Sequence, residues 1–101
     1  MPAGIAALLG SHPAVRECAV RLMRPEEGER LKAFIVPRDE AILDAPAALG
    51  RELRVWLAKR LSPPETPKSL LFGPELPRTV SGKLADWSIF PDSFFDLRPR
   101  R

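Results

Sequence analysis

The sequence has little of several residue types that common functional sites need. Its 101 residues include one cysteine, Cys18, and one histidine, His12. A lone cysteine excludes an internal disulfide framework and favours a reducing compartment, so we expect the protein in the cytoplasm. One cysteine and one histidine cannot complete a tetrahedral zinc site, and we predict no metal site. We interpret Cys18 as a small core residue and His12 as a turn residue, which leaves no Ser–His–Asp set.

Long apolar runs and a strong charge excess are missing as well. No segment approaches the roughly 20 apolar residues of a membrane span, and the stretch MPAGIAALLGSHP has no basic leader, so we expect no membrane contact. The net charge is only +3, and part of that excess lies in residues 98–101. Charges of both signs are mixed along most of the chain, which indicates a solvated surface. We therefore predict no nucleic-acid partner, because such proteins usually show a basic stripe with interleaved aromatics.

What the chain does contain suits one small domain. PAGIAALLGSHP (2–13) carries apolar residues at helical spacing and predicts a short helix. AVRECAVRLM (14–23) and RLKAFIVP (30–37) are strand-like and flank the polar turn PEEGE (25–29), which predicts a β-hairpin. We interpret the carboxylates of that turn, Glu26 and Glu27, as surface groups that serve solubility.

The second half predicts one strong helix and one short strand. LGRELRVWLAKRL (49–61) has an apolar stripe, and KSLLFG (68–73) is a short apolar run after the proline-rich breaker SPPETP (62–67). The stripe consists of Leu49, Leu53, Trp56, Leu57 and Leu61. Together these elements predict an α+β fold, in which a small sheet of a β-hairpin plus a short strand carries two to three helices.

We divide the chain into a domain over residues 1–86 and an aromatic and basic tail over residues 87–101. The tail carries Trp87, Ile89, Phe90, Phe94 and Phe95. Its aromatic side chains either close a core or form a docking patch if they are exposed. The residues leave both interpretations open.

Lys83 is the candidate functional residue. In LPRTVSGKLADW (76–87), Gly82 gives the backbone freedom, while Thr79 and Ser81 supply hydroxyl groups before the lysine. The stretch fails the phosphate-binding-loop pattern, because Leu84 stands where that pattern needs Ser or Thr. A presented lysine is a compact point charge suited to meeting an anion. Composition and spacing alone also allow an ordinary exposed loop lysine.

Several segments, in order, carry a resemblance to a known family. LLGSHPAVRECAV, EEGERLKAFIVP, RELRVWLAKRLSPPETPKSLLF and LPRTVSGKL resemble the small C-terminal domain of the adenylate-forming enzymes. That superfamily contains acyl- and aryl-CoA ligases, adenylation domains of nonribosomal peptide synthetases, and luciferase. The resemblance covers residues 2–85, and its most specific part is Pro77-Arg78-Thr79 followed by Ser81-Gly82-Lys83.

The resemblance implies a C-terminal lid domain of an ATP-dependent ligase that adenylates an acyl or aryl acid. It implies that Lys83 is the catalytic lysine and that Arg78, Thr79, Ser81 and Gly82 support its loop. ATP, with Mg²⁺, is then bound mainly by a large N-terminal domain, in the same chain or a separate one. The acceptor implied is CoA or the phosphopantetheine arm of an acyl carrier protein.

The sequence also departs from the family pattern. The large domain and the hinge are not part of it, so we expect no activity of this chain alone. Family members usually carry a basic residue shortly after the lysine, whereas Ala85-Asp86-Trp87 stand here. The departures keep open a non-catalytic protein-interaction or regulatory module that retains the fold. A third hypothesis is a nucleic-acid binder, which is suggested only by the pI and the basic end at residues 98–101.

Overall fold

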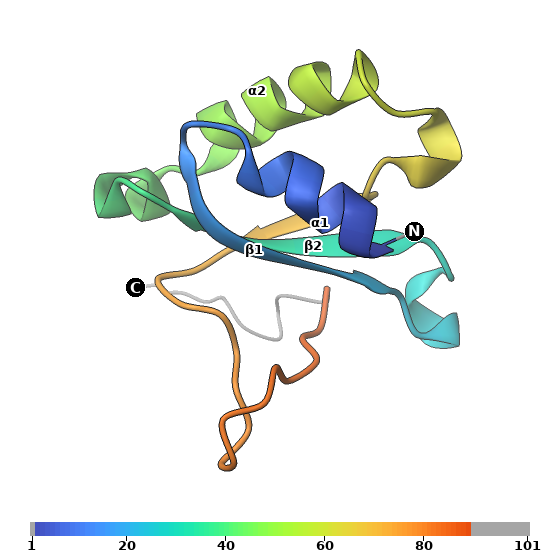
Figure 1. The fold of residues 1–101 in the computed structure, drawn as a ribbon, viewed down its shortest axis with the longest axis vertical. Coiled ribbons are helices and arrows are strands. Elements are labelled where there is room, and N and C mark those ends of the chain that lie inside the picture. Colours follow the sequence, from blue (N-terminus) through green and yellow to red (C-terminus); the bar gives the residue numbers. More distant parts are fainter. Residues whose placement is uncertain (1, 90–101) are drawn as a thin grey trace.

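The structure is a computed structural model and describes residues 2–89. It contains two α-helices and three strands, which confirms the α+β prediction (Figure 1). In chain order these are α1 (Pro2–Gly10), β1 (Val15–Leu22), β2 (Leu31–Pro37), α2 (Ala47–Ala58) and β3 (Ser69–Phe72). Short 3-10 helices occupy Pro25–Glu27, Glu40–Asp44 and Pro63–Glu65.

The sheet has the strand order β1-β2-β3. β1 and β2 pair antiparallel with Arg21 opposite Lys32, as the hairpin prediction requires, and Gly28 in their connection has a φ of 122°. That left-handed conformation suits glycine, which has no Cβ to clash. β3 pairs parallel to β2, with Ser69 opposite Lys32. A parallel neighbour requires a crossover connection, and α2 lies within it.

Both helices cover one face of the sheet, where they form the larger apolar core (Figure 1). Ala33 and Ile35 of β2 point into this core, because side chains alternate between faces along a strand. The fully enclosed members of this cluster are Leu9, Val15, Ala33, Ile35, Leu49, Leu53 and Leu57. The predicted apolar stripe of α2 is confirmed at Leu49, Leu53 and Leu57, which are buried. Trp56 and Leu61 are partly buried and pack against this core.

The opposite face of the sheet is covered by residues 73–89, which we call the cover segment (Figure 1). Phe34 and Val36 point to this side and form a second apolar cluster with Trp87. The rings of Phe34 and Trp87 meet edge to face with centroids 5.8 Å apart. Trp87 therefore closes a core, which is one of the two interpretations of the tail aromatics.

The rest of the predicted tail, residues 90–101, lies outside the described residues, and this includes Phe90, Phe94, Phe95 and the basic end. The division at residues 86 and 87 stays a prediction. Among residues 2–89, no helix is both long and apolar enough to cross a membrane.

Candidate functional site

Lys83 lies in a tight turn that projects from the cover segment, at the end remote from the helices (Figure 1). Arg78 and Leu84 form an isolated antiparallel bridge across the base of this turn. The Thr79 amide donates to the Lys83 carbonyl at 2.8 Å, and the Gly82 amide donates to the Thr79 carbonyl at 2.9 Å. Gly82 has a φ of 89°, so its predicted backbone freedom is used to close the turn.

The structure brings all five predicted site residues together in this turn. The Lys83 amide donates to Thr79 Oγ1 at 3.2 Å, and the hydroxyls of Thr79 and Ser81 lie 3.1 Å apart. Arg78 donates through Nη1 to the Gly82 carbonyl at 3.3 Å. Four of the five residues therefore shape the turn, and the Lys83 side chain remains as the group it presents.

The Lys83 side chain is exposed. Within residues 2–89 its ammonium group makes neither a hydrogen bond nor an ion pair. It is therefore a compact positive charge, held at a defined backbone position and available to an anion.

A buried cation contacts the cover segment just after the turn. Lys32 of β2 is fully enclosed on the cover-segment side of the sheet. Its Nζ lies 2.8 Å from Glu27 Oε1 and 3.1 Å from Asp86 Oδ1, and it donates to the Trp87 carbonyl at 2.5 Å. Nζ thus makes two hydrogen bonds and one further ion pair, which is how a buried ammonium avoids the cost of desolvation.

The interpretation of Glu27 as a surface group is wrong. Its side chain is fully buried, whereas that of Glu26 is 64% exposed. The 3-10 turn directs Glu27 inward, where Oε1 accepts from the Arg24 amide at 2.9 Å and Oε2 accepts from the Ile89 amide at 3.1 Å. Burial acts to raise the pKa of Glu27, but the Lys32 hydrogen bond and these two amides outweigh it and lower the pKa to about 2.

His12 and Cys18 have structural surroundings, as the sequence indicated. His12 is buried at the turn after α1, where Nδ1 accepts from the Ala14 amide at 3.0 Å and Nε2 lies 3.0 Å from Glu52 Oε2. Cys18 Sγ lies 3.2 Å from the Ala6 carbonyl, and burial raises the pKa of the thiol. A raised pKa keeps the thiol protonated, which disfavours a nucleophile.

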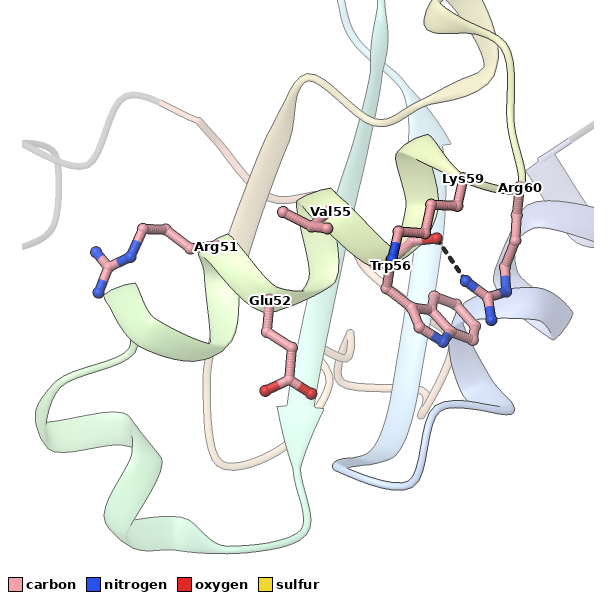
Figure 2. Close-up of a pocket in the computed structure, with 6 residues that line it drawn as sticks. All are labelled: Arg51, Glu52, Val55, Trp56, Lys59 and Arg60. Atoms are coloured by element: carbon pink, nitrogen blue, oxygen red, sulfur yellow. Dashed lines mark hydrogen bonds between the residues drawn. The ribbon is translucent and has the colours of Figure 1, made fainter.

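A hollow lies on the outer face of α2 and is lined by Arg51, Glu52, Val55, Trp56, Lys59 and Arg60 (Figure 2). Arg60 stacks over the Trp56 ring at 4.1 Å and donates to the Trp56 carbonyl at 2.8 Å. Figure 2 shows Arg51 pointing away from Lys59 and Arg60, so these cations do not converge on one point. Within residues 2–89, no group of three or more His, Cys, Asp or Glu side chains is placed to hold a metal ion.

Sequence reasoning missed the contacts behind the Lys83 turn. Lys32 interrupts an apolar strand, and a charge inside such a run is a signal that a buried partner exists. Asp86 was noted only as a departure from the family pattern. Its contact with Lys32 joins residues 54 positions apart, 86 − 32 in the numbering, and no local pattern reports such a pair.

The family match and the most similar relatives point to the same family. Residues 4–83 match the family described as the AMP-binding enzyme C-terminal domain. A 4-coumarate–CoA ligase of Cereibacter sphaeroides is 44% identical over 86 residues, which are 85% of this chain and 19% of that protein. An acetyl-coenzyme A synthetase of Burkholderia lata is 41% identical over 83 residues, 79% of this chain and 12% of that protein.

A solved structure agrees with these sequence matches. The benzoate CoA ligase of Burkholderia xenovorans superposes with a TM-score of 0.66 at 32% identity, over 82% of this chain and 17% of that one. The chain spans about a fifth or less of the length of these relatives. With the family match, the sequence identities and the shared fold in agreement, the chain belongs to the AMP-binding enzyme C-terminal domain family, the C-terminal domain of acyl- and aryl-CoA ligases.

Proposed function

We propose that this domain is the C-terminal lid of an ATP-dependent ligase that adenylates an acyl or aryl acid, and that Lys83 is its catalytic residue. One observation carries the proposal. Lys83 is the last residue of the family match, and it stands exposed and without a partner among the described residues on a turn closed by its own hydrogen bonds. The domain supplies this lysine to the active site of a large ATP-binding domain.

The chemistry of adenylation explains why a cation is needed there. The attacking carboxylate and the phosphate it approaches are both anionic, and they repel one another. A fixed ammonium group between them lowers that repulsion as negative charge redistributes in the transition state. The turn contributes by holding Lys83 in place before the substrates meet, so little reorganisation is required when they do.

ATP supplies the adenylyl group and, with Mg²⁺, is held mainly by the large domain in this proposal. Lys83 is the group of the turn that fits a phosphate or carboxylate oxygen. The large domain is part of the same chain or a separate partner. The names of the relatives favour CoA as the acceptor, with the phosphopantetheine arm of an acyl carrier protein as the alternative. Rotation of the lid after adenylation withdraws Lys83.

The test is ATP–pyrophosphate exchange by the chain together with its large domain. Lys83→Ala is expected to lower the exchange rate on the order of 100-fold or more, as for other lost electrostatic contacts to a transition state. Lys68→Ala is the matched control, because Lys68 is also exposed but lies next to β3, outside the turn. An unchanged rate in Lys83→Ala refutes the catalytic role. Equal binding of the large domain by both variants, with no dependence of exchange on Lys83, identifies an interaction module instead.

A further inference from the structure

Asp86 departs from the family pattern in charge, and the structure shows what its carboxylate contacts. The resemblance implies a basic residue shortly after the lysine, whereas this chain has an acid three positions after Lys83. The Asp86 carboxylate lies 3.1 Å from Lys32 Nζ, 3.6 Å from Arg21 Nη1 and 3.8 Å from Arg24 Nη1. One carboxylate therefore faces three cations, which belong to β1, to β2 and to the residues just after β1.

We propose that Asp86 is a positioning residue that fastens the C-terminal side of the Lys83 turn to the sheet. The inference rests on the proposed function of Lys83. Arg21 assists by a second route, because its Nη2 donates to the carbonyl of Leu84 at 3.0 Å, directly after Lys83. The chain leaving the turn is thus held at residues 84, 86 and 87 by groups on two paired strands.

The other side of the turn has a separate attachment. The Gly73 amide donates to the Ile35 carbonyl at 3.1 Å, and Arg16 Nη2 donates to the Pro74 carbonyl at 2.9 Å. Figure 1 shows the turn between these attachments on the side of the sheet opposite the helices, so the attachments to the sheet set its direction. A lysine that must meet a reacting group within a few tenths of an ångström depends on such supports.

The three cations also determine which groups the negative charge of Asp86 pairs with. A free carboxylate three residues from Lys83 would compete with the substrate for the ammonium group. Two cations on the sheet, Arg21 and Lys32, and Arg24 just after β1 hold the Asp86 carboxylate instead, and Lys83 remains without a partner among the described residues. The acid therefore strengthens the base of the turn without neutralising the group that the turn presents.

Removing Asp86 separates positioning from folding. Asp86→Ala leaves Lys32 bound to Glu27 and to the Trp87 carbonyl, so the buried cation keeps both of its hydrogen bonds and loses one ion-pair partner. The Asp86 side chain is itself 35% exposed, which limits the loss of stability. We therefore expect Asp86→Ala to fold and to keep both apolar cores, while the turn loses one of its supports.

The experiment is ATP–pyrophosphate exchange by the chain with its large domain. Asp86→Ala is expected to lower kcat on the order of 10- to 100-fold and to leave KM for ATP and for the acid within about twofold, because a misplaced group costs rate rather than binding. Asp86→Glu, which keeps the carboxylate, is expected to recover part of the rate. Glu26→Ala is the matched control, because Glu26 pairs with Arg24 at 3.2 Å, and within residues 2–89 it makes no hydrogen bond or ion pair with the cover segment.

A double variant decides whether Asp86 acts through Lys83. If it does, adding Asp86→Ala to Lys83→Ala costs no further activity, since the misplaced group is already gone. If the kcat losses of the two single variants multiply in the double variant, the inference is refuted. A wild-type kcat in Asp86→Ala while Lys83→Ala is impaired refutes it as well. Both results leave the proposed function standing. Wild-type activity in Lys83→Ala overturns both. Should Asp86→Ala fail to fold, Arg21→Gln cuts the Leu84 contact and the Asp86 pair while sparing Lys32, and the same loss of kcat is expected.

Discussion

Replacing Lys32 by methionine is expected to lower the free energy of unfolding by about 3–5 kcal/mol, the usual cost of breaking a buried pair from one side. The side chains of Lys32 and Glu27 are both fully buried, with Nζ and Oε1 2.8 Å apart. Methionine fills a similar volume without a charge, so cavity formation contributes little. The loss comes from Glu27, whose buried charge keeps only Arg24 and the Ile89 amide as partners.

The size of this effect relative to the whole domain makes it measurable. Domains of this size are stable by roughly 5–15 kcal/mol, so the variant loses about a fifth of its stability or more. Urea unfolding followed by tryptophan fluorescence is a direct assay, because the Trp87 ring lies 5.3 Å from Lys32 Nζ in the same network. Circular dichroism reports the helices independently of Trp87 and checks that unfolding remains a single transition.

A double variant separates the unpaired charge from the lost interaction. Glu27→Gln combined with Lys32→Met removes both charges and is expected to recover at least half of the loss, since replacing a whole buried pair is often close to neutral. The reasoning is refuted if Lys32→Met unfolds within about 1 kcal/mol of the wild type. A double variant that is less stable than Lys32→Met alone also contradicts it.

Two further predictions concern the same face of the sheet. The folded-state pKa of Glu27, about 2, lies below its ordinary value of 4.5, so its stabilising contribution is complete above pH 4.5 and is lost as the pH falls from there towards 2. Urea midpoints between pH 5 and 2 should fall more steeply for the wild type than for Glu27→Gln, and parallel curves would contradict the assignment. Gly73→Ala places a Cβ 2.5 Å from Phe34 Cζ and is expected to lower the free energy of unfolding by about 1–3 kcal/mol. A Cβ at Gly4 of α1 meets no atom within 4 Å, so Gly4→Ala should be neutral or slightly stabilising. Equal melting temperatures of the two variants would refute this reasoning.

The elements that sequence predicted well are those encoded by local patterns. The stripe of α2 gave a helix whose leucines at 49, 53 and 57 are buried, and the two β-branched and aromatic runs gave the antiparallel hairpin. The stretch that contains Lys83 was predicted to present this lysine, and the hydrogen bonds within residues 78–84 join residues at most four positions apart. Hydrophobic periodicity, turn-forming residues and helix caps can all be recognised from a few neighbouring residues.

The error at Glu27 has the opposite origin. An acidic residue beside a glycine in a polar turn usually faces water, and Glu26 does so. Nothing within the turn reports that the next carboxylate points inward to a lysine five positions later and to an amide at residue 89. Burial of a charge depends on which distant groups arrive to pair with it, and that is a property of the assembled fold.

The sequence by itself determined the α+β class, the helices and strands, and the lysine that the turn presents, because these depend on neighbours along the chain. Only the tertiary structure decided that the segment after β3 returns across the free face of the sheet. That return brings Asp86 and Trp87 to Lys32 and encloses an ion pair beneath the Lys83 turn. Such contacts form only when the sheet and the cover segment exclude water together, and so the support of Lys83 belongs to the fold rather than to the motif.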